Sequence, residues 1–227
     1  MKLRFKHQKF QEDATNAVCD VFAGQPNETR KFLVDQGAGV DSRQVAAIDM
    51  ARTGWANSEI RLRPDDLLKN LRSVQKQYGI SPVTNKIETL VSKVVWDDGL
   101  KETVERPVFT VEMETGTGKT YTYIKTMYEM NARYGWSKFI IVVPSVAIRE
   151  GVAKSFQITA DHFREEYGKA CRFFVYNSSR LNELEQFADD SGINVMIINT
   201  QAFNASGKDA RRIYMKLDSF RSRRPID

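Results

Sequence analysis

The residues best suited to carry chemistry form a glycine-rich run followed by a lysine and a threonine. Residues 114–120 read Glu-Thr-Gly-Thr-Gly-Lys-Thr and lie between a predicted strand and a predicted helix. Glycines let the backbone curl so that N–H groups surround phosphate oxygens, and the positive end of the following helix adds to the attraction. We expect Lys119 to reach the β- and γ-phosphates of ATP and the Thr120 hydroxyl to hold Mg²⁺. The predicted nucleotide-binding loop comprises Thr115, Gly116, Thr117, Gly118, Lys119 and Thr120.

This loop departs from the most common phosphate-binding pattern at one position. Met113 stands where the first glycine of G-x-x-x-x-G-K-[ST] is usual, and kinases and GTPases generally keep that glycine. A short Thr-Gly-Thr-Gly-Lys-Thr core with a looser first position resembles the loop of superfamily-two helicases and translocases.

A second resemblance to that superfamily lies near the N-terminus. Phe10 and Gln11 precede Glu12-Asp13-Ala14 on a predicted helix, and the run is similar to the helicase Q-type motif. The resemblance implies that the Gln11 amide selects adenine by donating and accepting one hydrogen bond each. It also implies an aromatic neighbour for the base, which is Phe10 or Phe5.

Two further runs follow predicted strands and resemble the nucleic-acid-contacting elements of the same superfamily. Pro144 and Ser145 start a helix that carries Arg149 one turn later. The helix-start N–H groups and the arginine are suited to a DNA phosphate. Thr200 and Gln201 follow the last predicted strand and are the second pair of expected DNA contacts.

More narrowly, residues 111–120 and 140–151 resemble the restriction (Res) subunit of type III restriction–modification enzymes. The long insertion between Gln11 and Lys119 is similar to that family too. The resemblance implies an enzyme that uses ATP and Mg²⁺ to move along or switch state on double-stranded DNA. It further implies cleavage by a separate C-terminal nuclease domain and a modification (methyltransferase) subunit as partner.

The given sequence contains no acidic Walker B box, which would read Asp-Glu-x-x directly after a predicted strand. That box supplies a carboxylate for Mg²⁺ and for orienting water. We therefore expect an N-terminal part of the first motor lobe, truncated before the box and inactive alone. Two alternatives stay open: a stand-alone superfamily-two DNA or RNA helicase without a nuclease, and a non-catalytic nucleotide-binding module.

From residue 107 onward, predicted strands alternate with predicted helices, which indicates an α/β fold with a mainly parallel sheet. The resemblance implies that this part is a RecA-like P-loop NTPase lobe. Strands are predicted at 108–113, 138–143, 172–176 and 194–199, and helices at 119–134, 145–156, 163–167 and 181–187. Before them we expect a Q-motif-like helix within 1–26 and a partly mobile insertion at 27–106. The insertion is predicted to hold a loop at 36–57, a helix from Pro64 to Gly79 and a hairpin turn at 96–99.

Composition excludes several classes of protein. The 227 residues include 34 Lys or Arg and 29 Asp or Glu. The excess positive charge lies between residues 207 and 224, and we expect this segment to be either a solvated helix or a face that contacts phosphates. The longest apolar run, 139–143, is far shorter than a membrane span, and two cysteines give no disulfide framework. We expect a cytoplasmic protein, with His7, His162 and Tyr121 in structural roles.

Overall fold

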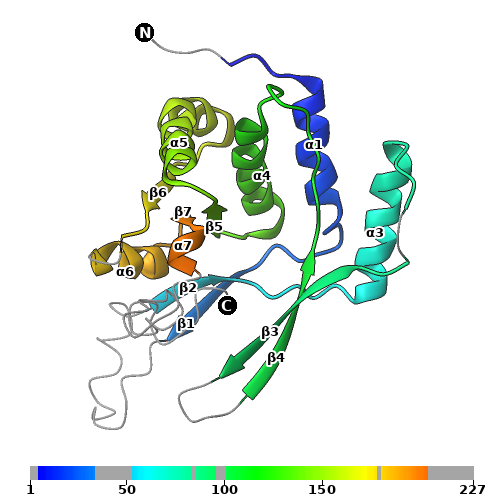
Figure 1. Ribbon diagram of the computed structural model, residues 1–227, viewed down its shortest axis with the longest axis horizontal. Coiled ribbons are helices and arrows are strands. Elements are labelled where there is room, and N and C mark those ends of the chain that lie inside the picture. Colours follow the sequence, from blue (N-terminus) through cyan, green and yellow to red (C-terminus); the bar gives the residue numbers. More distant parts are fainter. Residues whose placement is uncertain (1–4, 34–52, 83–84, 96–100, 178–179, 204–227) are drawn as a thin grey trace.

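The computed structural model of the chain describes residues 5–33, 53–82, 85–95, 101–177 and 180–203 (Figure 1). Its elements, in chain order, are α1 (Lys9–Asp20), β1 (Thr29–Leu33), β2 (Thr53–Asn57), α3 (Pro64–Gln77), β3 (Glu88–Val95), β4 (Lys101–Val108), α4 (Lys119–Tyr134), β5 (Lys138–Val143), α5 (Val146–Tyr167), β6 (Cys171–Val175), α6 (Leu181–Asp189), β7 (Ile193–Asn199) and α7 (Thr200–Phe203). None of the helices within the described ranges is long and apolar enough to cross a membrane.

A three-stranded parallel sheet forms the centre of the α/β part, in the order β5-β7-β6. The central strand β7 is apolar on both faces because helices cover both. Val195 and Ile197 pack in one cluster with residues of α4 and α5, whereas Met196 and Ile198 pack with α6. This arrangement confirms the predicted α/β class and the predicted strands in β5, β6 and β7.

The strand predicted at 108–113 is wrong. Strand β4 ends at Val108, and residues 109–114 are neither helix nor strand. A strand needs partners for its backbone N–H and C=O groups, and β5 pairs only with β7 among the described residues. Phe109 instead packs edge-on against Phe22 beyond α1, with ring centroids 5.6 Å apart. The segment therefore approaches the glycine loop alongside α1 (Figure 1).

The two helices predicted at 145–156 and 163–167 are one continuous helix, α5, of 22 residues. The predicted break falls on a stretch with polar and β-branched side chains. Thr159 is accommodated there because its hydroxyl donates to the Ser155 carbonyl oxygen at 2.8 Å, within the helix. Phe156 and Phe163 lie seven positions apart and are both buried, so the apolar face continues through the stretch.

The insertion before the α/β part is partly ordered into strands. Residues 36–52 of the predicted loop and the turn at 96–99 lie outside the described residues, but Thr53–Asn57 form β2 and pair antiparallel with β1. The loop prediction is wrong for β2, because this strand is held by hydrogen bonds from Asn57 to residues that are distant in the sequence. Asn57 accepts from the backbone N–H groups of Ser137 and Lys138 and donates to the Lys138 carbonyl oxygen. The predicted helix α3 is confirmed, and β3 pairs antiparallel with β4.

Helix α1 lies between α4 and α3 and packs against α4 along its length (Figure 1). The two helices run in the same direction, because Thr15 donates to the Thr122 carbonyl oxygen near one end and Tyr134 donates to the Cys19 carbonyl oxygen at the other. This packing confirms the predicted opening helix and brings residues more than 100 positions apart into contact.

Candidate nucleotide-binding site

The predicted loop forms an open N-terminus for α4. Gly118 precedes the helix in the left-handed region, with φ of 85° and ψ of 39°, and Gly116 also has φ of 85°. A side chain is strained in that region, so the turn requires glycine at both positions. Gly118 brings no side chain to cap the helix, which leaves the first N–H groups of α4 for an external acceptor.

The lysine of the loop lies next to the loop backbone. The Lys119 ammonium donates to the Glu114 carbonyl oxygen at 2.8 Å and is exposed to solvent. The same oxygen accepts from the Thr117 hydroxyl at 2.7 Å and from the Thr117 N–H at 3.4 Å. Three donors of the loop therefore converge on the Glu114 carbonyl oxygen, and one of them is the solvent-exposed ammonium.

The structure brings Gln11 to this loop. Its amide nitrogen donates to the Thr117 carbonyl oxygen at 2.8 Å, although the two residues are 106 positions apart. The resemblance implies a contact of Gln11 with adenine, and the contact with the loop is an additional finding of the structure. A Cβ added at Gly118 would lie 2.4 Å from the Gln11 amide nitrogen, so a side chain at position 118 would force the flexible Gln11 side chain to move.

The two candidate aromatic residues differ in their surroundings. Phe10 is on α1 with 48% of its surface exposed. Phe5 stacks on Tyr121 with centroids 5.8 Å apart and lies 5.1 Å from the ring of His162. Phe5 is therefore the aromatic residue that contacts the first turn of α4.

Tyr121 and His162 are hydrogen-bonded to each other, a contact that the sequence did not predict. The Tyr121 hydroxyl and His162 Nε2 are joined by a hydrogen bond of 2.8 Å, and burial raises the pKa of Tyr121 to about 12, which keeps the hydroxyl protonated. The position of Tyr121 directly after Thr120 was the available signal for a role near the loop. Nothing in the sequence marked His162 as its partner.

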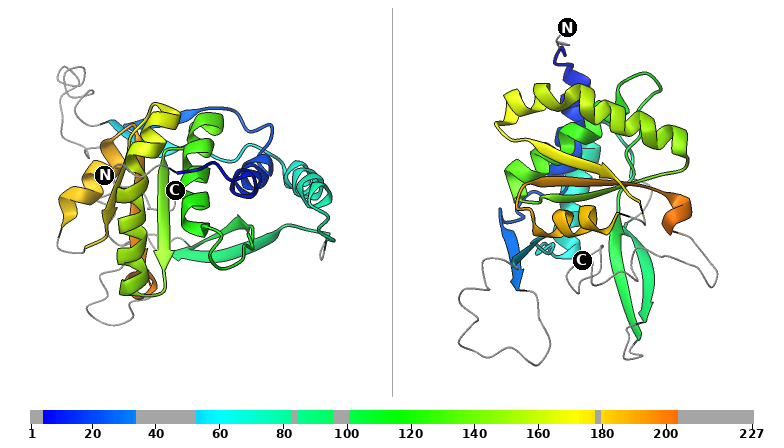
Figure 2. Two further views of the ribbon diagram at one scale, coloured as in Figure 1. Left: turned by 90° about the horizontal axis from the view of Figure 1, so that it is seen from above. Right: turned by 90° about the vertical axis from the view of Figure 1, so that its left-hand side faces the viewer.

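The candidate DNA contacts lie at one edge of the sheet. Val143 and Asn199 are paired in register at the carboxyl ends of β5 and β7, so Pro144 and Thr200 begin at the same edge. The left view of Figure 2 shows the N-termini of α4 and α5 at the end to which the β5 arrow points. The glycine loop and these residues therefore share this edge.

The side chains at this edge have local partners. Ser145 caps α5 as predicted, accepting from the Ile148 N–H at 3.3 Å. Arg149 donates to the Glu150 carboxylate at 3.1 Å, and Gln201 is exposed on the short helix α7. The basic residues between 207 and 224 lie outside the described residues.

For Mg²⁺, Thr120 is the predicted protein ligand, in the first turn of α4. Within the described ranges, no cluster of three or more His, Cys, Asp or Glu is arranged to hold a metal ion. An ion at this loop would be held by the Thr120 hydroxyl and by phosphate oxygens, which is the ligand set that Mg²⁺ accepts at nucleotide sites.

Comparison with known proteins decides the family. A family model described as "Type III restriction enzyme, res subunit" matches residues 68–220, more than half of the chain. The chain belongs to the type III restriction enzyme Res subunit family. The matched range includes the glycine loop and both candidate DNA-contacting elements. Gln11 precedes this range, so its place in the site is supported by its contact with Thr117.

Individual Res subunits are similar to this chain as well. The EcoPI Res subunit of Escherichia phage P1 is 33% identical over 162 residues, and the EcoP15I Res subunit of Escherichia coli is 31% identical over 160 residues. Each match covers 66% of this chain and 15% of the relative. The StyLTI Res subunit of Salmonella typhimurium is 40% identical over 116 residues, covering 42% of this chain and 12% of the relative.

Proposed function

We propose that this chain forms the ATP-binding motor lobe of a type III restriction endonuclease subunit. In this proposal ATP drives translocation or switching on double-stranded DNA, and a nuclease domain elsewhere in the polypeptide cuts the DNA. The observation that carries the proposal is the glycine loop. This loop belongs to a Res-family chain and combines two glycines with positive φ, a helix N-terminus without a side-chain cap and an exposed lysine ammonium.

Each loop residue has a distinct part in this proposal. The N–H groups at the start of α4 bind phosphate oxygens, and the Lys119 ammonium pairs with the β- and γ-phosphates. The Thr120 hydroxyl holds Mg²⁺, which neutralises charge on the phosphates when bound. Gln11, fixed to the loop through Thr117, presents its amide oxygen to the adenine amino group.

The DNA contacts follow from the shared edge of the sheet. The N-terminus of α5 at Ser145 offers N–H groups to a phosphate, and Thr200 and Gln201 follow the neighbouring strand. Arg149 would exchange its Glu150 partner for a DNA phosphate. The family's relatives are named as Res subunits of restriction–modification enzymes, and we propose a modification subunit as the partner here.

The test is Lys119→Ala in the full-length subunit assembled with its modification partner. We expect loss of ATP hydrolysis and of ATP-dependent DNA cleavage, because the phosphates lose their cationic partner. The matched control is Lys154→Ala, which removes an exposed lysine from α5. Full ATPase activity in the Lys119 variant would reject the loop assignment. ATP hydrolysis without DNA cleavage in the wild-type complex would favour a stand-alone helicase.

A further inference from the structure

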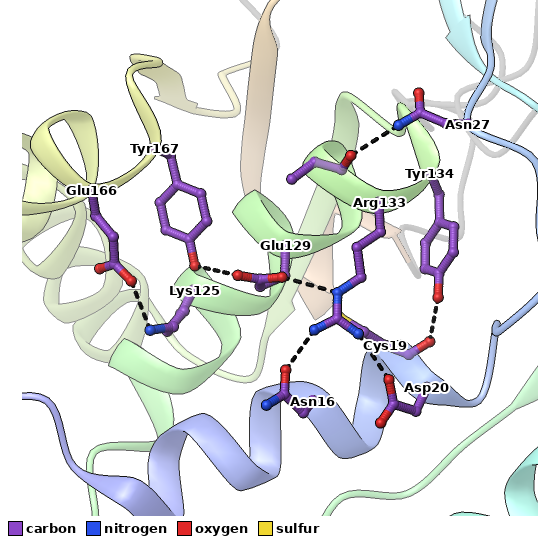
Figure 3. Close-up of polar contacts among 11 residues, drawn as sticks. Asn16, Cys19, Asp20, Asn27, Lys125, Glu129, Arg133, Tyr134, Glu166 and Tyr167 are labelled. Carbon is purple, nitrogen blue, oxygen red and sulfur yellow. Dashed lines mark hydrogen bonds and ion pairs between the residues drawn. The ribbon is translucent and has the colours of Figure 1, made fainter.

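Arg133, near the C-terminus of α4, joins three acceptors with its three guanidinium nitrogens (Figure 3). Nη1 donates to Asp20 at 2.8 Å, and Nη2 donates to Asn16 at 2.5 Å, both on α1. Nε donates to Glu129 on α4 at 3.0 Å. The guanidinium therefore links two successive turns of α1 to one turn of α4.

The neighbours of Arg133 strengthen this link. Tyr134 donates its hydroxyl to the Cys19 carbonyl oxygen at 2.8 Å, and this contact is buried. Glu129 accepts a further hydrogen bond at 2.8 Å from Tyr167 of α5, so its carboxylate is held from both sides (Figure 3). Helix α1 is thus held at its C-terminal end by a network that includes α4 and α5.

The opposite end of α1 carries Gln11. Helix α1 has 12 residues and is about 18 Å long. Because a helix is stiff over this length, its position along α4 is set by its contacts at both ends. A slip of one residue moves the helix by about 1.5 Å, which is enough to break the 2.8 Å hydrogen bond from Gln11 to Thr117.

We propose that Arg133 is a positioning residue for nucleotide recognition: by fixing the register of α1 on α4, it holds the Gln11 amide where it can distinguish adenine from other bases. This inference rests on the proposed function, in which Gln11 reads the base. Arg133 acts through α1, because α4 is 16 residues and about 24 Å long and its glycine loop lies at the other end.

The network requires an arginine. A planar guanidinium directs separate N–H groups at separate acceptors, whereas a lysine ammonium is a single point with a different reach. The side chains of Arg133, Asp20 and Glu129 are 32%, 46% and 23% exposed. If the arginine is removed, water can therefore satisfy only part of the hydrogen bonds that these side chains lose. Arg133→Lys therefore keeps the charge and removes the fork.

The experiment measures binding of ATP and GTP to the full-length subunit by equilibrium titration with fluorescent analogues. For Arg133→Lys we expect the preference for ATP over GTP to fall roughly three- to tenfold. In a Gln11→Ala background, the same substitution is expected to change the preference no further. Arg164→Lys is the matched control, since Arg164 pairs with exposed Asp161 on its own helix, and it is expected to keep the wild-type preference.

Two outcomes would overturn the inference. One is an unchanged ATP-to-GTP preference in Arg133→Lys, including the case in which both affinities weaken equally. The other is a loss of preference that adds to that of Gln11→Ala. If Arg133→Lys does not fold, Asp20→Asn removes one charge at constant size and is judged by the same two criteria. Intact ATP binding in Lys119→Ala would instead reject the proposed function itself.

Discussion

The Gln11 amide nitrogen lies 2.8 Å from the Thr117 carbonyl oxygen, in a contact that joins α1 to the glycine loop. The contact passes over Gly118, where a Cβ would come within 2.4 Å of the same nitrogen. Position 118 therefore needs glycine for its positive φ and for the approach of Gln11.

These two requirements can be separated by substitution. Gly118→Ala is expected to cost about 1–2 kcal/mol of unfolding free energy from its left-handed backbone, and to push the flexible Gln11 side chain away from Thr117. Gly168→Ala is the matched control, because Gly168 also has positive φ but nothing within 4 Å of an added Cβ. We expect similar losses of stability in urea denaturation, and weaker ATP binding in the Gly118 variant alone. Equal ATP binding in the two variants would contradict this prediction.

Ser145 combines a helix cap with a proposed phosphate contact, and Ser145→Asp distinguishes the two. Aspartate caps a helix as well as serine does, so the stability is expected to stay within about 0.5 kcal/mol of the wild type. Its negative charge repels a DNA phosphate, and we expect weaker DNA binding in fluorescence anisotropy at low salt. Ser145→Ala, which loses the cap, is expected to cost about 1 kcal/mol. Unchanged DNA affinity in Ser145→Asp would remove Ser145 from the DNA contacts.

The ion pair of Lys125 and Glu166 joins α4 to α5 at 2.8 Å, with the lysine side chain only 7% exposed (Figure 3). Glu166→Gln leaves the buried ammonium without a counter-charge, and we expect a loss of about 3 kcal/mol in unfolding free energy. The double variant Lys125→Met/Glu166→Leu is expected to recover most of this loss, since burying neither charge avoids the desolvation cost. Urea denaturation measures both. A double variant as unstable as the single one would show that packing, not charge, is the cause.

Burial lowers the pKa of His162 below its ordinary value of about 6.5. Since unfolded His162 binds a proton more readily than folded His162, the free energy of unfolding is expected to rise with pH in the window below 6.5 and to level off above it. Among the charged groups around the ring, Glu166 and Glu165 oppose this shift by raising the pKa of His162, whereas His7 and Lys125 lower it further. The Tyr121 hydroxyl is hydrogen-bonded to the ring at Nε2. His162→Gln is expected to reduce this slope in urea denaturation between about pH 5 and 8. An identical slope in the variant would contradict the prediction.

The elements that sequence reasoning predicted are those with local causes. Strand β5 is a β-branched run, Ser145 caps α5, and Gly135 ends α4 in the left-handed region. The errors have distant causes. Strand β2 depends on Asn57 bonding to residues 80 positions away, and residues 109–114 lack a partner strand among the described residues.

The candidate site divides in the same way. The glycine loop was predictable because one contiguous run contains all its residues. The contact of Gln11 with Thr117 and the two bonds from Arg133 to α1 join residues more than 100 positions apart and depend on the register of two helices. Periodicity shows which face of a helix is apolar, but it does not show which residue of the neighbouring helix lies opposite.

Under the proposed function, the bond between Lys119 and the Glu114 carbonyl oxygen would make nucleotide binding a competition. An arriving triphosphate must displace a neutral acceptor that the protein itself supplies, so the net affinity is the difference between two interactions. When the products dissociate, the Glu114 carbonyl oxygen would again accept the hydrogen bond from the Lys119 ammonium. The hydrogen bond to Glu114 thus fixes the orientation of the lysine that, in the proposed function, pairs with the phosphates.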